Sequence, residues 1–429
     1  MADLSRFLLL GIVAFALALR WWLAGRQIVH LRLRQGFTEA EAHARAYAIA
    51  RARLEVFAAF LETALILLFT IGGGIAWLSR FWQGRPGLGA ILVATVVAAF
   101  AVLRGLLRLY QARVLDVRFG LASRAPLRLL AAPLSQGIIA IAVAAAMGEA
   151  LRWLIDTGWR EWWLGAAALW SIVLIVQVWA EPVLSLWFGH RAQPLADSSL
   201  RQRLQKLLDR AGLRRAKMYR ITSAFPSRRA NARLAGAGRW RRIELADTLL
   251  KLLAPAEVEA VVAHELGHWH GAHIAWDLAL RVLAGFVGFA LLAAAMAART
   301  LGNSIGLGPE ASPPAFFAAG VALLPLARFF LTPLVAFLHR RFEYAADAFA
   351  AREADPRALI AALEKLYSVN ATVRSADPIY AGFYASHPEP VPRIRRLEAL
   401  ARQAELHLEP ERREHRLHRG RNGEQPRIG

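Results

Sequence analysis

The chain is dominated by long apolar runs that alternate with polar, arginine-rich stretches. Each run has about 20 residues or more, the length that an α-helix needs to cross the ~30 Å hydrocarbon core of a membrane. One such run could be a buried helix of a large soluble protein, but a succession of them favours a mainly α, polytopic membrane protein. The seven predicted spans are Phe7–Leu23, Val56–Leu78, Leu88–Leu107, Leu127–Ala146, Trp162–Phe188, Leu278–Ala298 and Ala315–Leu338.

Arginines concentrate between the first and second spans, between the third and fourth, and in the long segment after the fifth. Loops rich in Lys and Arg stay on the cytoplasmic side of a membrane. This pattern therefore predicts that the long segment and the C-terminal segment are cytoplasmic. The 429 residues include 53 basic and 32 acidic side chains, a net charge of +21. Membrane orientation accounts for that charge, so we expect membrane lipids and no nucleic acid as partners.

The polar segment after the fifth span contains the sequence His264-Glu265-Leu266-Gly267-His268, in a stretch that follows Pro255 and is expected to be helical. Residues i and i+4 share a helix face, so both histidines can bind one metal ion. Glu265 would then reach a metal-bound water without being a ligand. Taken singly, each histidine is equally explained as a surface or core residue. Nearby His273 is expected to support the ligands or to lie at the surface.

A third ligand is needed, and the chain has no cysteine to provide it. Glu343 and Asp347 follow the seventh span with a spacing of four residues, so both can face one site. An isolated pair of this kind is usually a solvated acidic face. Spans six and seven, however, form a hairpin that returns the chain to the side that holds His264. Glu343 is therefore a candidate third ligand, and Asp347 a candidate acceptor for a ligand's imidazole N–H.

A further polar cluster, Ser386-His387-Pro388 with Arg393, follows on the same side. Histidine and arginine are suitable donors to a tetrahedral oxyanion. The alternative is that this region is simply basic, because Arg395 and Arg396 also lie in it.

Together these motifs resemble the type I CAAX prenyl protease family of integral-membrane zinc metalloproteases. The resemblance includes the element Asn231-Ala232, the stretch from Arg241 to Leu250, and Arg118-Phe119-Gly120 before the fourth span. It also includes the layout of seven spans, with the site split around spans six and seven. It covers nearly the whole chain except the tail.

The resemblance implies seven transmembrane helices that enclose a chamber, with a cytosolic, zincin-like α+β catalytic region. It implies one Zn²⁺ bound by His264, His268 and Glu343. Glu265 would be the general base, and Asp347 would orient a ligand. The expected activity is hydrolysis of peptide bonds near the C terminus of prenylated or other peptide substrates.

By the same resemblance, His387 and Arg393 would stabilise the oxyanion. We also expect the strand Asn231–Leu234, with Asn231 and Ala232 as substrate-binding residues, to pair with extended substrate backbone beside the metal. The glycines that follow this strand, Gly236 and Gly238, predict a hairpin.

These inferences divide the chain into five predicted regions. They are 1–189 with spans one to five, 190–276 with the cytosolic catalytic region, 277–338 with spans six and seven, 339–400 with C-terminal catalytic helices, and 401–429 as a disordered basic tail. The scarcity of lysine favours a bacterial gene and hence the bacterial cell membrane, or the ER membrane if the gene is eukaryotic.

Three other hypotheses compete with this one. A membrane quality-control metalloprotease of the HtpX-like type would share the zinc motif, but such proteins usually have fewer spans. A site-2-type intramembrane protease would need the zinc helix inside lipid, where Glu257 and Glu259 would be costly. A transporter or channel is suggested by Glu62 and Arg328 within spans, but leaves the zinc motifs unexplained. The sequence leaves the natural substrate and the oligomeric state open.

Overall fold

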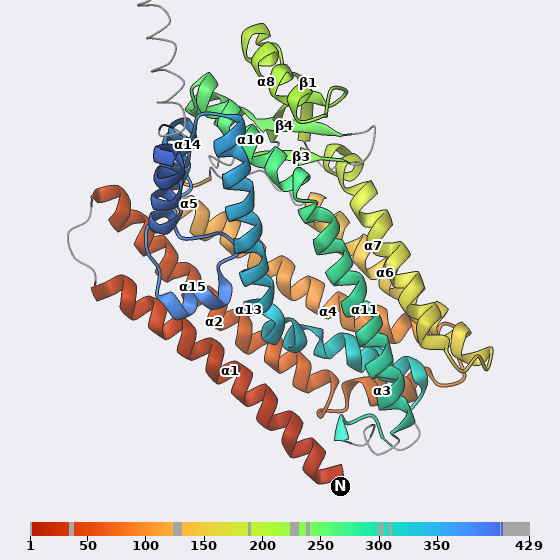
Figure 1. The fold of residues 1–429 in the computed structure, drawn as a ribbon. Coiled ribbons are helices and arrows are strands. Elements are labelled where there is room, and N and C mark those ends of the chain that lie inside the picture. The colour runs from red at the N-terminus through yellow and green to blue at the C-terminus, as the bar shows by residue number, and fades with distance from the viewer. Residues whose placement is uncertain are drawn as a thin grey trace, which may run out of the picture.

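The structure is a computed structural model, and it describes residues 2–33, 38–122, 131–187, 190–223, 231–236, 241–298, 302, 304–308, 311–403 and 405. Long helices run through the lower part of Figure 1, and a small sheet with shorter helices lies at one end of them. The fold class predicted from the sequence, a mainly helical polytopic membrane protein with a small α+β region, is confirmed.

Within the described residues, six helices are long and apolar enough to cross a membrane, and a bent pair of helices supplies a seventh candidate span. The pair, α2 (Glu39–Phe69) and α3 (Gly74–Trp82), bends by 46°. Gly73 in the bend has a φ of 74°, which glycine adopts without strain. The single helices are α1 (Ala2–Leu33), α4 (Leu88–Tyr110), α6 (Ala131–Asp156), α7 (Trp162–Trp187), α11 (His273–Ala297) and α13 (Pro313–Glu353).

Every predicted span coincides with one of these elements, although residues 127–130 and 188 lie outside the described residues. The helices extend further than predicted. Arg26 and Arg45, which the sequence analysis placed in a loop, lie on α1 and α2. Similarly, α4 continues into a π-helix, η1 (Gln111–Leu115), and α5 (Asp116–Arg118). The helices do not stop at the end of the apolar run because long arginine side chains solvate the additional turns.

Three charged side chains within the spans, Arg20, Glu62 and Arg104, are paired with one another. Glu62 of α2 lies 3.2 Å from Arg20 Nη1 of α1 and 3.3 Å from Arg104 Nε of α4. Arg20 also donates to the Pro325 carbonyl of α13 at 3.3 Å and lies over the ring of Phe329. Paired charges are tolerated at membrane depth far better than single ones. Glu62, one basis of the transporter hypothesis, therefore links neighbouring helices.

Helices α4 and α6 approach closely at two glycines. A Cβ on Gly148 would lie 2.3 Å from the Gly89 carbonyl oxygen. We expect Gly148→Ala to lower the melting temperature of the detergent-solubilised protein, because overpacking costs about 1–3 kcal/mol. In an open helical position, alanine instead gains about 1 kcal/mol over glycine. Gly137→Ala on the same helix meets no atom within 4 Å and should be neutral or stabilising. Equal melting temperatures for the two variants would contradict this contact.

The sheet has the strand order β1-β2-β4-β3. β1 (His190–Pro194) pairs antiparallel with β2 (Lys217–Ser223), and β2 pairs parallel with β4 (Arg242–Ala246). β4 pairs antiparallel with β3 (Ala232–Ala235), which confirms the predicted hairpin. β1 was not predicted from the sequence. β3 is an edge strand, so one side of it is open to a further strand.

One apolar core joins this sheet to the helices around it. Leu204, Leu207, Ile243 and Leu266 are fully buried there. Burial of each such side chain stabilises the fold by about 1.5–3 kcal/mol. The core therefore fixes the helix of the His-Glu motif relative to the sheet. The helices that contribute include α8 (Ser198–Arg210), α9 (Asp247–Leu252), α10 (Pro255–His270), α14 (Pro356–Val369) and the last turns of α13, with Phe349 and Ala350.

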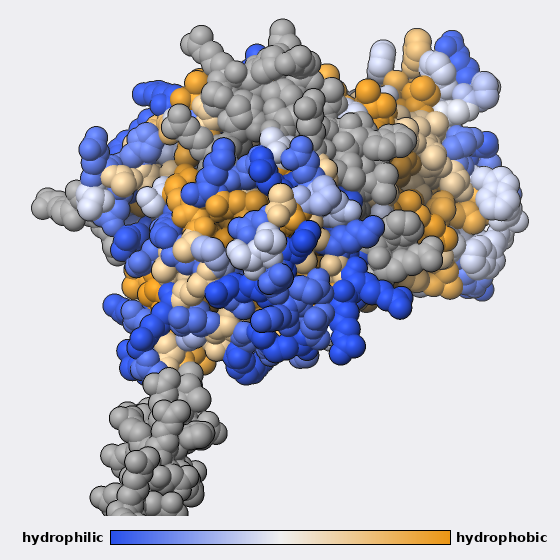
Figure 2. Space-filling view, turned by 90° about the horizontal axis from the view of Figure 1, so that it is seen from above, coloured by the Kyte–Doolittle hydropathy of each residue, from blue (hydrophilic) through white to orange (hydrophobic). Residues whose placement is uncertain are grey.

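Two further helices complete this end of the molecule, α15 (Pro378–Tyr384) and a helix over residues 390–403. The predicted tail, 401–429, begins inside the second of these, and residues 406–429 lie outside the described residues. Viewed from above, hydrophilic residues cover much of the face drawn in Figure 2.

Candidate metal centre

Helix α10 presents His264 and His268 on one face. The helix starts with Pro255, whose missing N–H would have had no partner in the first turn. Glu257 accepts a backbone N–H at the helix start and forms an ion pair with Lys365 at 2.6 Å. These contacts fix the first turn. The spacing of four residues then brings the two imidazoles to the same side of the helix.

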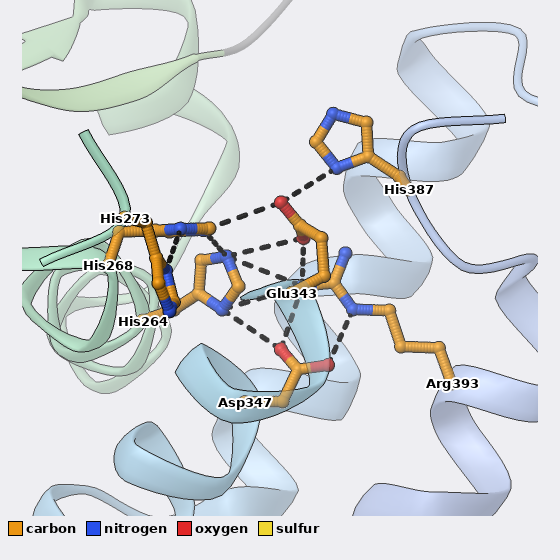
Figure 3. A network of polar contacts seen from close by, with 7 residues as sticks. All are labelled: His264, His268, His273, Glu343, Asp347, His387 and Arg393. Carbon is orange, nitrogen blue, oxygen red and sulfur yellow. Dashed lines mark hydrogen bonds and ion pairs between the residues drawn. The ribbon is translucent and has the colours of Figure 1, made fainter. Parts of the chain in front are cut away.

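Helix α13 supplies two carboxylates to the same place. It touches α10 at Gly267, where a Cβ would lie 2.7 Å from the Cα of Ala346. This close approach buries Glu343 and Asp347 against α10. Figure 3 shows both carboxylates facing the imidazoles.

The donor atoms of His264, His268 and Glu343 all lie within 4.8 Å of one another. Nε2 of His268 is 3.2 Å from Nε2 of His264 and 3.3 Å from Oε1 of Glu343. Oε2 of Glu343 is buried, and among the described residues it accepts no hydrogen bond of standard geometry. Two imidazole nitrogens and one carboxylate that face a common point fit a zinc ion with an open fourth position.

Asp347 and Arg393 contact the proposed ligands His264 and Glu343. Oδ1 of Asp347 lies 2.9 Å from Nδ1 of His264, the contact expected for an oriented ligand imidazole. Arg393 donates to both Asp347 oxygens, at 2.7 and 2.8 Å, and its Nη2 lies 3.2 Å from Oε2 of Glu343. Arg393 as a whole is only 5% exposed. This geometry favours a supporting role for Arg393 over the oxyanion-donor role expected from the sequence.

His387 approaches Glu343 from a different side, as Figure 3 shows. Its Nδ1 lies 3.0 Å from Oε1 of Glu343, and its side chain is 70% exposed. The hydrogen bond with Glu343 raises the pKa of His387, which favours the protonated, donating imidazolium. The preceding α15 is anchored by the Arg26–Asp377 ion pair at 2.9 Å and by Arg340, which donates to carbonyl groups of α15.

Glu265 faces the edge strand. The backbone N–H of Leu234 in β3 donates to its carboxylate. Burial raises the pKa of Glu265 above its ordinary value. A raised pKa is the direction expected for a carboxylate that takes up a proton near neutral pH.

The register of β3 decides which of its backbone groups face the open edge. The Ala246 N–H donates to the Asn231 carbonyl at 3.0 Å, so Asn231 and every second residue after it pair with β4. Ala232 and Leu234 therefore direct their N–H and C=O groups to the open edge. Of the two predicted substrate-binding residues, Ala232 offers its backbone there and Asn231 does not. Leu234 is the last residue of the strand predicted to pair with substrate, and strict alternation along that strand identifies it as a second residue that faces the open edge.

The structure thus gathers the predicted chemistry at one place. A His-Glu-x-x-His helix, with carboxylates supplied by a second helix, is the arrangement of a zinc metallopeptidase site. Here the site lies where the membrane helices meet the α+β region. The predicted residues that converge on it are His264, Glu265, His268, Glu343, Asp347, His387 and Arg393.

Comparison with known proteins supports the same class. Residues 194–401 match the model of peptidase family M48, and residues 27–186 match the model described as CAAX prenyl protease N-terminal, five membrane helices. These two matches together span residues 27–186 and 194–401, and they confirm the resemblance drawn from the motifs.

Similar proteins include CAAX prenyl protease 1 homolog of Arabidopsis thaliana and CAAX prenyl protease 1 of Saccharomyces cerevisiae, each 30% identical over 54% of this chain. The alignments cover 56% and 55% of those proteins, so the chain matches about half the length of these curated relatives. The crystal structure of S. mikatae Ste24p shares the fold, with a TM-score of 0.78 at 20% identity. The structural match covers 92% of this chain and 98% of the Ste24p chain.

Proposed function

We propose that the protein is a zinc metalloendopeptidase of the membrane that hydrolyses peptide bonds near the C terminus of peptide substrates, prenylated or unmodified. The observation that carries this proposal is the convergence of His264, His268 and Glu343 from two helices, with Glu265 beside them. Zinc held by these three residues would polarise the scissile carbonyl and acidify the attacking water.

Glu265 moves the proton in this proposal. Its carboxylate takes a proton from the attacking water and returns it to the leaving amine nitrogen. The Leu234 N–H keeps the carboxylate next to the open edge of β3, where extended substrate would lie. Base and substrate backbone are therefore held by the same strand.

His387 and Arg393 have different roles in this proposal. The exposed imidazolium of His387 can donate to an oxyanion that develops on the scissile carbonyl. Arg393 keeps Asp347 in place, and Asp347 orients the His264 imidazole. A donor that is fixed before the reaction stabilises the developing charge without reorganisation.

The open edge of β3 supports main-chain recognition of the substrate. An extended peptide that adds to a sheet edge is bound through its backbone, which leaves side-chain choice to the surrounding surface. The groups available for this are the N–H and C=O of Ala232 and the C=O of Leu234, because the Leu234 N–H already donates to Glu265.

Ala232→Pro tests this binding mode. Proline removes an N–H that faces the open edge, so the pairing of β3 with β4 should persist. Loss of one backbone hydrogen bond of about 1 kcal/mol should raise the KM for a peptide about fivefold, with an unchanged melting temperature. Arg233→Pro, which removes a group that faces β4, should instead lower the melting temperature. An unchanged KM for Ala232→Pro would contradict edge pairing.

The site would work at the cytoplasmic side of the membrane. The arginines between spans one and two and between spans three and four support this orientation, because loops rich in Arg stay on the cytoplasmic side. The low lysine content supports a bacterial gene, and a bacterial protein of this kind would lie in the cell membrane. If the gene is eukaryotic, the ER membrane is the alternative.

The match of residues 27–186 to an N-terminal model with five membrane helices favours this proposal over a quality-control protease of the HtpX-like type. The paired state of Glu62 removes one reason to propose transport.

Purified protein should be incubated with one CAAX peptide in farnesylated and unmodified forms, and the products weighed by mass spectrometry. The proposal expects a fragment released from the C-terminal end of at least one form. Comparable rates for the two forms would remove a requirement for the lipid. No cleavage of either form, by protein that contains zinc, would contradict the proposed activity.

A further inference from the structure

The Nδ1 atoms of the two proposed ligand imidazoles, His264 and His268, contact different chemical groups. Nδ1 of His264 faces a carboxylate, that of Asp347, at 2.9 Å. Nδ1 of His268 faces a third imidazole, with a distance of 2.9 Å to Nδ1 of His273. In Figure 3 the ring of His273 lies behind His268, away from Glu343. The geometry therefore does not make His273 a ligand.

The ring of His273 is buried and tightly packed. It is 7% exposed and stacks on Phe342 of α13, with ring centroids 4.2 Å apart and an interplanar angle of 13°. A Cβ on Gly271 would lie 2.3 Å from Nε2 of His273, so the ring occupies the space that a side chain at 271 would need. Ala272 has a φ of 51°, which L residues rarely adopt. The turn between α10 and α11 is thus built around this imidazole.

The contact between two Nδ1 atoms requires one proton between them. A histidine that binds a metal through Nε2 carries its proton on Nδ1. His268 is therefore the donor and His273 the acceptor, and the proton of His273 lies on its Nε2. Both rings are neutral in this arrangement.

We propose that His273 is a positioning residue that fixes the tautomer and ring orientation of His268, and that it does so as a neutral acceptor. This inference rests on the zinc site of the proposed function. It assigns the two ligands different support: an anionic acceptor at His264 and a neutral one at His268. The side-chain requirement at 273 is then an acceptor atom at the position of Nδ1, rather than aromatic packing alone.

Two substitutions separate these requirements. His273→Phe keeps the ring on Phe342 but removes the acceptor, whereas His273→Asn places an amide oxygen near the position of Nδ1. The zinc affinity of the purified full chain is measured by competition with a chelator, and the melting temperature of the metal-depleted protein is measured alongside. We expect His273→Phe to bind zinc about 10- to 100-fold more weakly than wild type. His273→Asn should recover most of this loss.

Wild-type zinc affinity in His273→Phe would overturn the inference. Equal losses of affinity in the Phe and Asn variants would do so too, because they would reveal a packing role. If His273→Phe does not fold, Gly271→Ala provides the same test by displacing the ring, and it should also weaken zinc binding. Failure of the zinc site itself looks different: the wild type would bind no zinc, or His264→Ala would bind it as tightly as wild type.

Discussion

Glu265→Gln is expected to reduce peptide cleavage by about 10²- to 10⁴-fold, the range that a positioned general base contributes. The amide has the shape of the carboxylate and its oxygen can still accept the Leu234 N–H, so the local structure should persist. The variant should keep one zinc per chain, because Glu265 does not belong to the donor group of His264, His268 and Glu343. Initial rates and zinc content, measured on the same preparation, check both parts.

The matched control is Glu259→Gln on the same helix. Glu259 pairs with Arg203 at 2.9 Å, away from the donor group, so its loss should leave cleavage unchanged. Unchanged cleavage by Glu265→Gln would show that another group acts as the base. Loss of zinc from Glu265→Gln would mean that the variant had disturbed the metal site, which contradicts the assigned geometry.

Gly267→Ala is expected to remove most of the peptide-cleavage activity, because the added methyl group would force α10 and α13 apart. The added Cβ would lie 2.7 Å from the Cα and 2.8 Å from the carbonyl oxygen of Ala346, so α10 and α13 must separate. Backbone atoms cannot turn aside as the end of a side chain can. The separation would move Glu343 and Asp347 away from the imidazoles, and a displacement of about 1 Å can reduce the rate about 10²-fold. Zinc affinity should fall with the rate.

The control for this prediction is Gly288→Ala in α11, where a Cβ meets no atom within 4 Å. Helix propensity alone predicts that both variants gain about 1 kcal/mol of stability. Only Gly267→Ala should lose zinc affinity and melt at a lower temperature. Wild-type activity in Gly267→Ala would show that the two helices are not in the contact described here.

The sequence predicts the membrane helices because each span carries its own signal, a run of apolar residues long enough to cross a bilayer. It also predicts the juxtaposition of His264 with Glu343, since a hairpin of two spans returns the chain to the side that it left. Both inferences depend on local pattern and simple topology.

Other features depend on contacts that no local pattern records. The parallel pairing of β2 with β4 brings together segments whose neighbours are decided by the whole fold. The acceptor of the Arg393 guanidinium is Asp347, on a different helix, so an arginine that was expected to face substrate is buried instead. His273 follows His268 closely, but its role depends on a turn with a left-handed alanine, which the sequence does not indicate.

The central claim is that His264, His268 and Glu343 form one zinc site at which the chain hydrolyses peptides. The most direct test is to titrate zinc into the metal-depleted protein and to measure peptide cleavage at each addition. Activity should rise from near zero in proportion to added zinc and level off at one zinc per chain. Cleavage that is already full in the depleted protein, or zinc that binds without restoring cleavage, would contradict the claim.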